Sequence, residues 1–513
     1  PYNKENFMPW LPLWLRTYQP TWLAGDLTAG LIVTVMLIPQ SLAYAMLAGL
    51  PPEVGLYASI LPIVAYALLG SSMTLAVGPV AVASLMTASA LQPLAAAGSP
   101  DYVALAVQLS LISGVMLLVF GALRLGFLAY FLSHPVISGF ITGSAVLIAV
   151  GQLKYIMGVK VAGSDVLETL AGLVKALPQT QPATLVIGVS SLLFLLLARR
   201  YLAQGLIRVG CSAKAADLMT KLAPMVAVIA STALVAGFKL NETAGVSVVG
   251  HVPQGLPQLA LSLPNMTTLG QLWLPALLIT LIGFVESVSV AQSLALKRQQ
   301  RIEPNRELLG LGAANVASAL SGGYPVTGGF SRSVVNFAAG ANTPLAGVIS
   351  AALMALVIAA LTGLFHYLPH AVLAATIIVA VTSLIDLKTL KEAWHYDRSD
   401  ALSLLATALG VVTLGVEAGI LTGVVLSLGV LVWRSSHPHM AVVGRVPGSE
   451  HFRNIKRHAV ETVPGLLALR VDESLFFANA TILEDYIEKL LTDDPSLRYV
   501  LLICSAVNQV DTT

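Results

Sequence analysis

Apolar stretches long enough to cross a lipid bilayer recur along most of the chain, and they constrain its fold more than any other feature. A transmembrane helix needs about 20 mainly apolar residues. Fourteen candidate stretches occur, seven on each side of a polar segment around Asn241 to His251. The pattern predicts an α-helical membrane protein with 14 transmembrane segments. Their approximate bounds are 27–45, 54–69, 79–91, 103–123, 127–155, 185–197 and 222–238, then 272–296, 308–320, 330–339, 345–364, 371–385, 401–412 and 420–432.

The overall composition supports a membrane location. Of the 513 residues, 56% are hydrophobic and only 11% are charged, and the mean hydropathy is +0.81. An ordinary soluble domain contains about 25% charged residues, so the apolar excess must face lipid. The net charge of +2 indicates no nucleic-acid partner. The two cysteines, Cys211 and Cys504, exclude a disulfide framework and indicate no structural zinc site.

Basic residues between the apolar stretches predict the orientation of the chain. Loops rich in lysine and arginine stay on the cytoplasmic side. With a cytoplasmic amino terminus, the connections on that side hold thirteen basic residues and those on the opposite side hold four. We therefore expect both termini in the cytoplasm. The cytoplasmic set is Arg124, Arg199, Arg200, Arg208, Lys214, Lys221, Lys297, Arg298, Arg301, Arg306, Lys388, Lys391 and Arg398, and the opposite set is Lys154, Lys160, Lys175 and Lys239.

Two of the stretches are too short and too rich in glycine and proline for ordinary transmembrane helices. The third begins at Val77-Gly78-Pro79, and the tenth follows the run from Gly322 to Gly329. Each is the third stretch of its group of seven, and such a matched pair is typical of an inverted-repeat transporter with discontinuous helices. The alternative is that glycine and proline are simply frequent in membrane helices. The pattern predicts a 7+7 inverted repeat within a transmembrane domain of residues 1–436, with repeats at about 20–240 and 270–434.

The carboxyl-terminal part differs in composition. Residues 437–513 are more polar, and short apolar runs at 440–443, 466–471 and 499–504 read as strands. Residues 480–491 have the spacing of an amphipathic helix. We expect residues 437–513 to form the first part of a cytoplasmic α/β domain, without a complete set of strands and helices.

The two broken segments also predict where a ligand binds. Irregular backbone at membrane depth lines a cavity or is buried in protein, and the free N–H groups at a helix N-terminus attract anions. Two such termini aimed at one point would replace the water that a small anion loses. We expect the donors to be the backbone at Val80 and Ala81 and at Ser331 to Ser333, with the hydroxyls of Ser331 and Ser333.

Arg332 and Glu286 are charged residues inside predicted membrane segments, where charge usually serves function. The planar guanidinium of Arg332 suits an oxyanion, and the alternative is a structural pair with a carboxylate. Burial disfavours an ionised carboxylate whereas a nearby arginine favours it. Glu286 therefore suits uptake of a proton together with the anion. The alternative is a permanent ion pair between Glu286 and Arg332.

The first apolar stretch contains polar side chains beside a proline. Pro39 is expected to interrupt this helix, and Gln40 and Tyr44 offer an amide and a phenol that could orient a polar substrate. The alternative is that both residues hold helices together. Asp26, Glu417 and the His134-Pro135 pair lie near predicted span ends and are expected to be interfacial or structural.

Sequence motifs for catalysis are absent. The chain has no Walker-A run, no HExxH, no GxSxG and no cluster of cysteine and histidine. We therefore expect no enzyme, no cofactor and no metal site. Without a sequence motif for ATP binding, the expected functions are secondary transport or an ion channel.

These stretches resemble the sulfate permease (SulP) family of anion transporters over nearly the whole chain. The most specific matches are Ile38–Ala45, Gly49–Pro52 with Gly55–Tyr57, Val77–Ala81, Ser133–Phe140, Phe284–Ser287 and Tyr324–Ser333. The tail from Val471 to Ala480 resembles the start of a STAS domain.

The resemblance implies core and gate domains, a homodimer and elevator-like movement. It implies an anion between the third and tenth segments, with Gln40, Tyr44, Ser331 and Arg332 at matching positions, and proton-coupled symport through Glu286. Sulfate is the expected substrate, and the plasma membrane of a bacterium is the expected location. Alternatives are sodium-coupled bicarbonate transport, dicarboxylate transport, chloride exchange, a nucleobase permease, an uncoupled anion channel and a sensor that signals through its tail.

Overall fold

The fold divides the chain into two compact units. The computed structural model describes residues 12–130, 134–161, 166–257, 259 and 262–512. Unit 1 comprises residues 1–423 and unit 2 residues 424–513, so the division falls inside helix α20 (Val416–Ser436).

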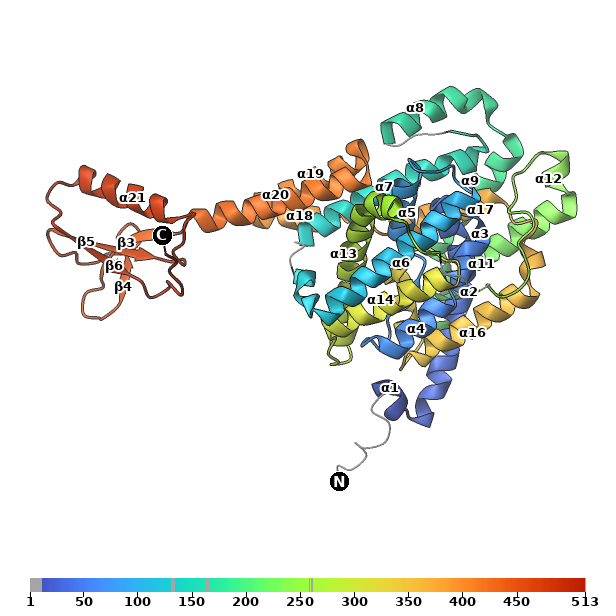
Figure 1. The fold of residues 1–513 in the computed structure, drawn as a ribbon, viewed down its shortest axis with the longest axis horizontal. Helices are drawn as coiled ribbons and strands as arrows, with labels where there is room; N and C mark the ends of the chain where they lie inside the picture. Colours follow the sequence, from blue (N-terminus) through green and yellow to red (C-terminus); the bar gives the residue numbers. More distant parts are fainter. Residues whose placement is uncertain (1–11, 131–133, 162–165, 258, 260–261, 513) are drawn as a thin grey trace. The chain divides into compact units, whose positions relative to one another are not determined.

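Unit 1 consists mainly of helices (Figure 1). Each of the fourteen apolar stretches contains a helix, and nine helical segments among the described residues are long and apolar enough to cross a membrane. The total of 14 spans remains a prediction. In the first half the helices are α1 (Leu13–Arg16), α2 (Leu23–Leu47), α3 (Pro52–Tyr57), α4 (Leu61–Leu69), α5 (Ala81–Leu91), α6 (Pro100–Ala122), α7 (His134–Met157), α8 (Val166–Ala176), α9 (Pro182–Leu197), α10 (Ala203–Arg208), α11 (Ala213–Phe238) and α12 (Leu240–Thr243). In the second half they are α13 (Met266–Leu296), α14 (Pro304–Leu320), α15 (Phe330–Ala338), α16 (Leu345–Ala360), α17 (His370–Thr382), α18 (Leu387–Tyr396), α19 (Arg398–Leu414) and α20.

Two short helices begin where the sequence predicts breaks. A two-residue strand precedes each of them: β1 (Val77–Gly78) precedes α5, and β2 (Thr327–Gly328) precedes α15. The strands pair antiparallel, with Val77 opposite Gly328 and Gly78 opposite Thr327. A helix cannot continue through this extended backbone, so each half-helix starts shortly after its strand. Because the two strands pair, both half-helices start at the same place in the interior.

Other predicted boundaries differ from the structure. Helix α2 is continuous from Leu23 to Leu47 with Pro39 inside it, so the predicted interruption is wrong. Pro39 removes one backbone donor, and the buried packing of this helix is sufficient to keep it intact. The stretch 54–69 is instead divided between α3 and α4, and α7 begins at His134 after a 3-10 helix at Leu125–Tyr130.

Close helix packing holds unit 1 together. The buried apolar cluster at its centre includes Leu37, Leu42, Ile148 and Leu373, from α2, α7 and α17. Helices approach closely at glycines: a Cβ on Gly55 would lie 1.9 Å from the carbonyl oxygen of Ser41. Small residues at such contacts are the usual basis of helix association in membranes.

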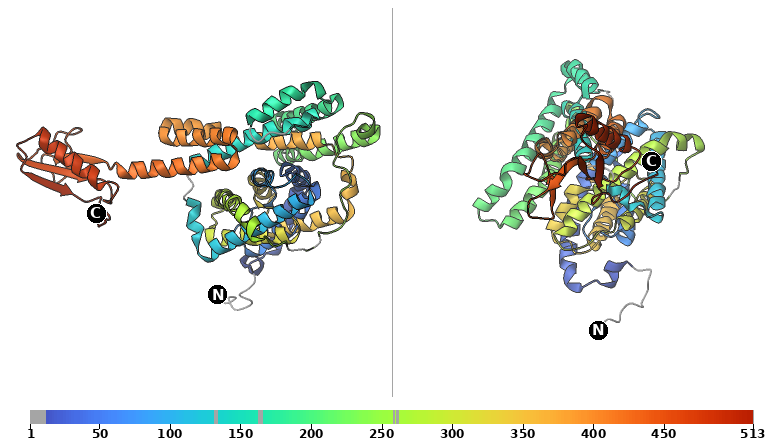
Figure 2. Two further views of the ribbon diagram at one scale, coloured as in Figure 1. Left: turned by 45° about the horizontal axis from the view of Figure 1, so that its top comes forward. Right: turned by 90° about the vertical axis from the view of Figure 1, so that its left-hand side faces the viewer.

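Unit 2 contains a four-stranded sheet with the order β4-β3-β5-β6. The strands are β3 (Met440–Arg445), β4 (Phe452–Asn454), β5 (Leu466–Val471) and β6 (Tyr499–Ile503). Pairs β3–β4 and β3–β5 are antiparallel, and β5–β6 is parallel. Helix α21 (Ala480–Asp493) covers one face of the sheet (Figure 2). Leu469, Val471 and Leu483 form the core between them. Three strands and the helix agree with the predicted elements, and β4 was not predicted.

Candidate anion-binding site

The N-termini of α5 and α15 have no side-chain caps. Val80 precedes α5 and Gly329 precedes α15, and neither residue accepts a backbone N–H through a side chain. The first N–H groups of a helix have no partner within the helix, and together they carry partial positive charge. Both half-helices therefore direct unused donors toward one region of the interior.

Arg332, in the first turn of α15, joins the two broken segments. Its side chain is 2% exposed, and Nη1 donates to the carbonyl oxygen of Pro79 at 2.5 Å and to Oε1 of Gln40 at 3.4 Å. Its Nε and Nη2 are buried and have no hydrogen-bond partner. A Cβ on Gly329 would lie 3.0 Å from Nη2, so glycine leaves room for the guanidinium. Arg332 thus keeps two donors that the protein does not use.

Glu286, on α13, contributes a carboxylate to the same region. Its Oε2 is buried and has no hydrogen-bond partner. In the described part of the chain, no hydrogen bond or ion pair joins Glu286 to Arg332. The permanent ion pair considered as an alternative is therefore not formed in this structure.

A small cavity brings most of the predicted site residues together. Its volume is about 50 Å³, which suits a few water molecules or a small ion better than a large organic substrate. Seven of the eight predicted residues line it, namely Gln40, Tyr44, Val80, Ala81, Glu286, Ser331 and Arg332. Val82, Gly329, Phe330, Ala380, Val381, Ser383 and Leu384 complete the lining.

Ser333 is the predicted site residue that lies outside this lining. Its hydroxyl donates to the carbonyl oxygen of Gly329 at 2.7 Å and accepts from the backbone N–H of Ala76 at 2.9 Å. Ser333 therefore connects the backbones of the two broken segments.

A second cavity of about 430 Å³ adjoins the small one. The two share Gln40, Phe330, Ser331, Ala380 and Ser383. The larger cavity also contacts Arg199 and Lys221. Lys221 is paired with Asp217 at 2.6 Å, whereas the positive charge of Arg199 favours the approach of an anion.

Several residues that fix the site were not predicted. Ser287, next to Glu286, has a hydroxyl 2.7 Å from Oγ1 of Thr327 and accepts the N–H of Gly328 at 2.9 Å. Thr327 also donates to the carbonyl oxygen of Gly283 at 2.7 Å. These bonds tie β2 to α13. Ser287 and Thr327 both lie in stretches that carry the family resemblance, Phe284–Ser287 and Tyr324–Ser333, but the sequence alone did not indicate that their side chains bind each other.

The described residues contain no group of three or more His, Cys, Asp or Glu side chains that could hold a metal ion. Neither cysteine is in a disulfide. Asp26 is buried and accepts backbone N–H groups from Asn342 and Thr343 at 2.6 and 3.0 Å, as expected of a structural residue. The side chain of Glu417 lies outside the described residues.

Comparison with solved structures identifies the fold. The murine Slc26a9 anion transporter in the inward-facing state superposes with a TM-score of 0.88 over 98% of this chain and 84% of that one, at 23% identity. The transmembrane domain of the cyanobacterial bicarbonate transporter BicA superposes with a TM-score of 0.68 over 78% of this chain and 98% of that one, also at 23% identity. The protein has the helical fold of the SLC26 transporters, with a STAS-like region after it.

Sequence comparison gives the family. Residues 23–407 match the sulfate permease family and residues 457–513 match the STAS domain. "Sulfate transporter 4.1, chloroplastic" of Arabidopsis thaliana is 36% identical over 98% of this chain and 73% of its own length. "Probable sulfate transporter MT1781" of Mycobacterium tuberculosis is 36% identical over 98% and 88%. The chain belongs to the sulfate permease family, whose members are membrane transporters and not enzymes.

Proposed function

We propose that the protein moves sulfate across the membrane by secondary active transport in symport with protons. The observation that carries this proposal is the arrangement at β1 and β2. Two uncapped half-helix N-termini start side by side, and Arg332 between them retains two unpaired buried donors. Backbone N–H groups and a guanidinium are the donors that an oxyanion needs when it loses water.

Sulfate fits these donors better than a larger or neutral substrate. The cavity of about 50 Å³ is small, and an arginine at its wall favours an anion over a nucleobase. The relatives named above carry sulfate transporter in their names, which supports the same choice. Sodium-coupled bicarbonate transport, dicarboxylate transport and an uncoupled channel are the competing functions.

Glu286 is the proposed proton-coupling group. It lines the same cavity as Arg332, and its Oε2 has no partner. A carboxylate that faces a bound dianion is repelled by it, and protonation removes this repulsion. Sulfate binding and proton uptake at Glu286 would therefore favour each other.

Alternating access completes the proposed mechanism. The cavity with Arg199 and Lys221 lies on the side predicted to be cytoplasmic, so the structure corresponds to an inward-facing state in this proposal. An elevator-like movement of the half-helices would carry the site to the opposite side. We further propose a homodimer in the plasma membrane of a bacterium, with both termini in the cytoplasm.

Uptake of radiolabelled sulfate into proteoliposomes tests the proposal. The wild type is compared with Glu286→Gln, with and without an inward proton gradient, and Glu303→Gln serves as an exposed control. We expect the gradient to stimulate uptake by the wild type and by the control. We expect uptake by Glu286→Gln to lose its dependence on the gradient.

The competing functions give different results. If folded protein carries no sulfate under any gradient, the sulfate assignment is wrong, and bicarbonate or dicarboxylate uptake is measured next, with sodium. If sulfate carries a current that is insensitive to Glu286→Gln, the protein is an uncoupled channel.

A further inference from the structure

Helix α14 lies against both connections that lead to the half-helices. It packs beside α4 and α6 (Figure 1). The loop 70–76 connects α4 to β1, and the loop 321–326 connects α14 to β2. Both loops must hold their shape for α5 and α15 to start where they do.

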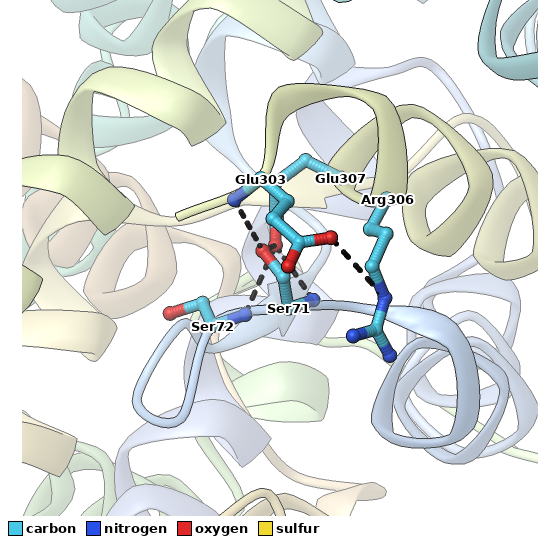
Figure 3. Close-up of polar contacts among 5 residues, drawn as sticks. All are labelled: Ser71, Ser72, Glu303, Arg306 and Glu307. Carbon is cyan, nitrogen blue, oxygen red and sulfur yellow. Dashed lines mark hydrogen bonds and ion pairs between the residues drawn. The ribbon is translucent and has the colours of Figure 1, made fainter. Parts of the chain in front are cut away.

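Glu307, near the start of α14, binds the first of these loops. Its side chain is completely buried. Its Oε1 accepts the backbone N–H groups of Ser71 and Ser72 at 2.8 and 3.0 Å, and the hydroxyl of Ser71 at 2.6 Å (Figure 3). Its Oε2 accepts the hydroxyl of Tyr66 at 2.7 Å. One carboxylate therefore takes four donors from the end of α4 and the loop after it.

The surrounding charges do not neutralise this carboxylate. Among the described residues, the neighbouring Arg306 forms its ion pair with Glu303, at 4.0 Å, and not with Glu307 (Figure 3). Ser71 extends the contact, because its hydroxyl also accepts the backbone N–H of Glu303 at 3.1 Å. A buried carboxylate is costly unless several hydrogen bonds satisfy it, and here the donors to Glu307 belong to α4 and the loop.

The first loop continues this set of bonds to the anion site. The hydroxyl of Ser72 accepts the backbone N–H of Leu75 at 3.1 Å, and Asn336 of α15 donates to the carbonyl oxygen of Thr74 at 3.0 Å. Ser333 then binds Ala76, directly before β1. A shift of the loop at Ser71 would therefore move β1 and the start of α5.

Asn315, eight residues further along α14, holds the second loop. Its Nδ2 donates to the carbonyl oxygen of Val326 at 2.9 Å, and its Oδ1 accepts the N–H of the same residue at 3.0 Å. Ser318 adds a bond to the carbonyl oxygen of Tyr324 at 2.7 Å. Because Asn315 follows Glu307 by eight residues, the two side chains leave α14 about 12 Å apart along the helix axis, one toward each loop.

We propose that α14 is a common support that sets the separation of the two half-helix N-termini, with Glu307 and Asn315 as positioning residues of the anion site. This inference rests on the proposed function, because it assumes that these N-termini bind sulfate. Neither residue lines the small cavity, so each acts through the loop that it holds.

The experiment compares Glu307→Ala, Glu307→Gln and Asn315→Ala with the wild type in the purified full chain. Binding of radiolabelled sulfate gives Kd, thermal unfolding gives Tm, and hydrogen exchange followed by mass spectrometry reports on separate segments. Glutamine keeps one carbonyl oxygen for the N–H groups of Ser71 and Ser72, so it serves as the conservative variant where alanine impairs folding.

A matched control is available at Asp26. Its buried carboxylate also accepts two backbone N–H groups and a hydroxyl, from Asn342 and Thr343. These residues follow the C-terminal end of α15, away from both N-termini. Asp26→Ala should therefore lower Tm as Glu307→Ala does, without weakening sulfate binding.

We expect Glu307→Ala to raise the sulfate Kd about tenfold or more, the change that corresponds to one lost charge-assisted hydrogen bond. Exchange should increase in residues 71–82 for Glu307→Ala and in residues 324–333 for Asn315→Ala. Glu307→Gln should bind sulfate more tightly than Glu307→Ala.

Two results would overturn the inference. One is an unchanged Kd in Glu307→Ala and Asn315→Ala despite a lower Tm, and the other is an equal rise of Kd in Asp26→Ala. A wild type that binds no sulfate would instead refute the proposed function, and the segment-specific exchange would then show independently whether Glu307 and Asn315 hold these loops.

Discussion

Arg332 and Glu286 lie at one cavity with opposite charges, yet each retains atoms that no protein group satisfies. The guanidinium is oriented through Nη1 by Pro79 and Gln40, which leaves Nε and Nη2 unpaired. Buried unpaired charge is costly in a membrane protein and usually marks the path of a substrate. The fixed orientation of Arg332 matters because a guanidinium binds an oxyanion through two parallel donors.

Arg332→Lys tests the importance of this geometry while it keeps the positive charge. Lysine has a single ammonium group and no planar fork, so it cannot bind Pro79 and an oxyanion in the same arrangement. We expect the sulfate Kd to rise about tenfold or more, as for the loss of one charge-assisted hydrogen bond. Direct binding of radiolabelled sulfate measures the change.

The control for this substitution is Arg200→Lys, because Arg200 is exposed and lines neither of the two cavities at the site. Its Kd should equal that of the wild type. Equal Kd values for Arg332→Lys and the wild type would show that only the charge of Arg332 matters, and the proposed bidentate contact would be wrong.

The sequence predicted most residues of the cavity because the chemistry of each is visible locally. A glycine–proline break and a charged residue in an apolar run are both short-range signals, and they led to Val80, Ala81, Ser331, Arg332 and Glu286. The direction of a hydroxyl is not visible locally, and Ser333 binds backbone outside the cavity lining. Residues at the end of α17, such as Ser383, line the cavity through long-range packing, which one sequence does not reveal.

At the scale of elements, each predicted stretch contains an observed helix because apolar stretches in a membrane have few alternatives to a helix. Shorter helices such as α8 and α18 were not predicted. The pairing of β1 with β2 was not predicted, since two residues per strand carry no periodic signal. The continuity of α2 through Pro39 was also missed. Its neighbours explain it: α2 packs against α3, α16 and α17, and these contacts outweigh one lost hydrogen bond.

Gly55→Ala tests the contact between α2 and α3. The added Cβ would lie 1.9 Å from the carbonyl oxygen of Ser41 and 2.7 Å from its carbonyl carbon. Backbone cannot move aside as a side chain can, so α3 must shift. We expect a loss of about 1–3 kcal/mol in the free energy of unfolding, as for other overpacked sites, measured by denaturant unfolding in detergent.

Gly270→Ala is the matched control on α13, because a Cβ added there would have no atom of the described residues within 4 Å outside its own helix turn. Alanine at an open helical site should stabilise the protein by about 0.5–1 kcal/mol. If Gly55→Ala is as stable as Gly270→Ala, the close approach of α3 to α2 is not required for the fold.

At the scale of the whole molecule, we expect the two units to respond to acid in different ways. In unit 2, burial raises the pKa of Asp472, but hydrogen bonds from Arg470 and His439 lower it, and the net shift is downward. The carboxylate lies 2.7 Å from Nε of Arg470 and 2.8 Å from Nδ1 of His439. A lowered pKa in the folded state means stability that is present above the unfolded pKa of about 3.9 and lost as the pH falls through the folded value.

We therefore expect unit 2 of the wild type to become less stable below about pH 4, the pKa range of an unperturbed aspartate. Asp472→Asn should lose part of this acid dependence while remaining less stable at neutral pH. Hydrogen exchange in residues 440–471, corrected for intrinsic rates, measures both effects. An identical pH dependence in the two proteins would show that Asp472 does not stabilise the sheet.

Acid should have the opposite effect on the sulfate-dependent stability of unit 1. A ligand that binds only the folded state stabilises it by about 2.7 kcal/mol at 100 times its Kd, so sulfate should raise the Tm of the wild type. If a proton binds Glu286 together with sulfate, the sulfate Kd should fall by up to about tenfold for each unit of decreasing pH. The rise in Tm at a fixed sulfate concentration should then grow as the pH falls.

Two variants test this expectation. In Glu286→Gln the rise in Tm caused by sulfate should be independent of pH, whereas in Arg332→Ala it should be small at every pH. Measuring all variants in an Asp472→Asn background separates this effect from the acid response of unit 2. If the sulfate-dependent rise in Tm still depends on pH in Glu286→Gln, the coupled proton binds another group.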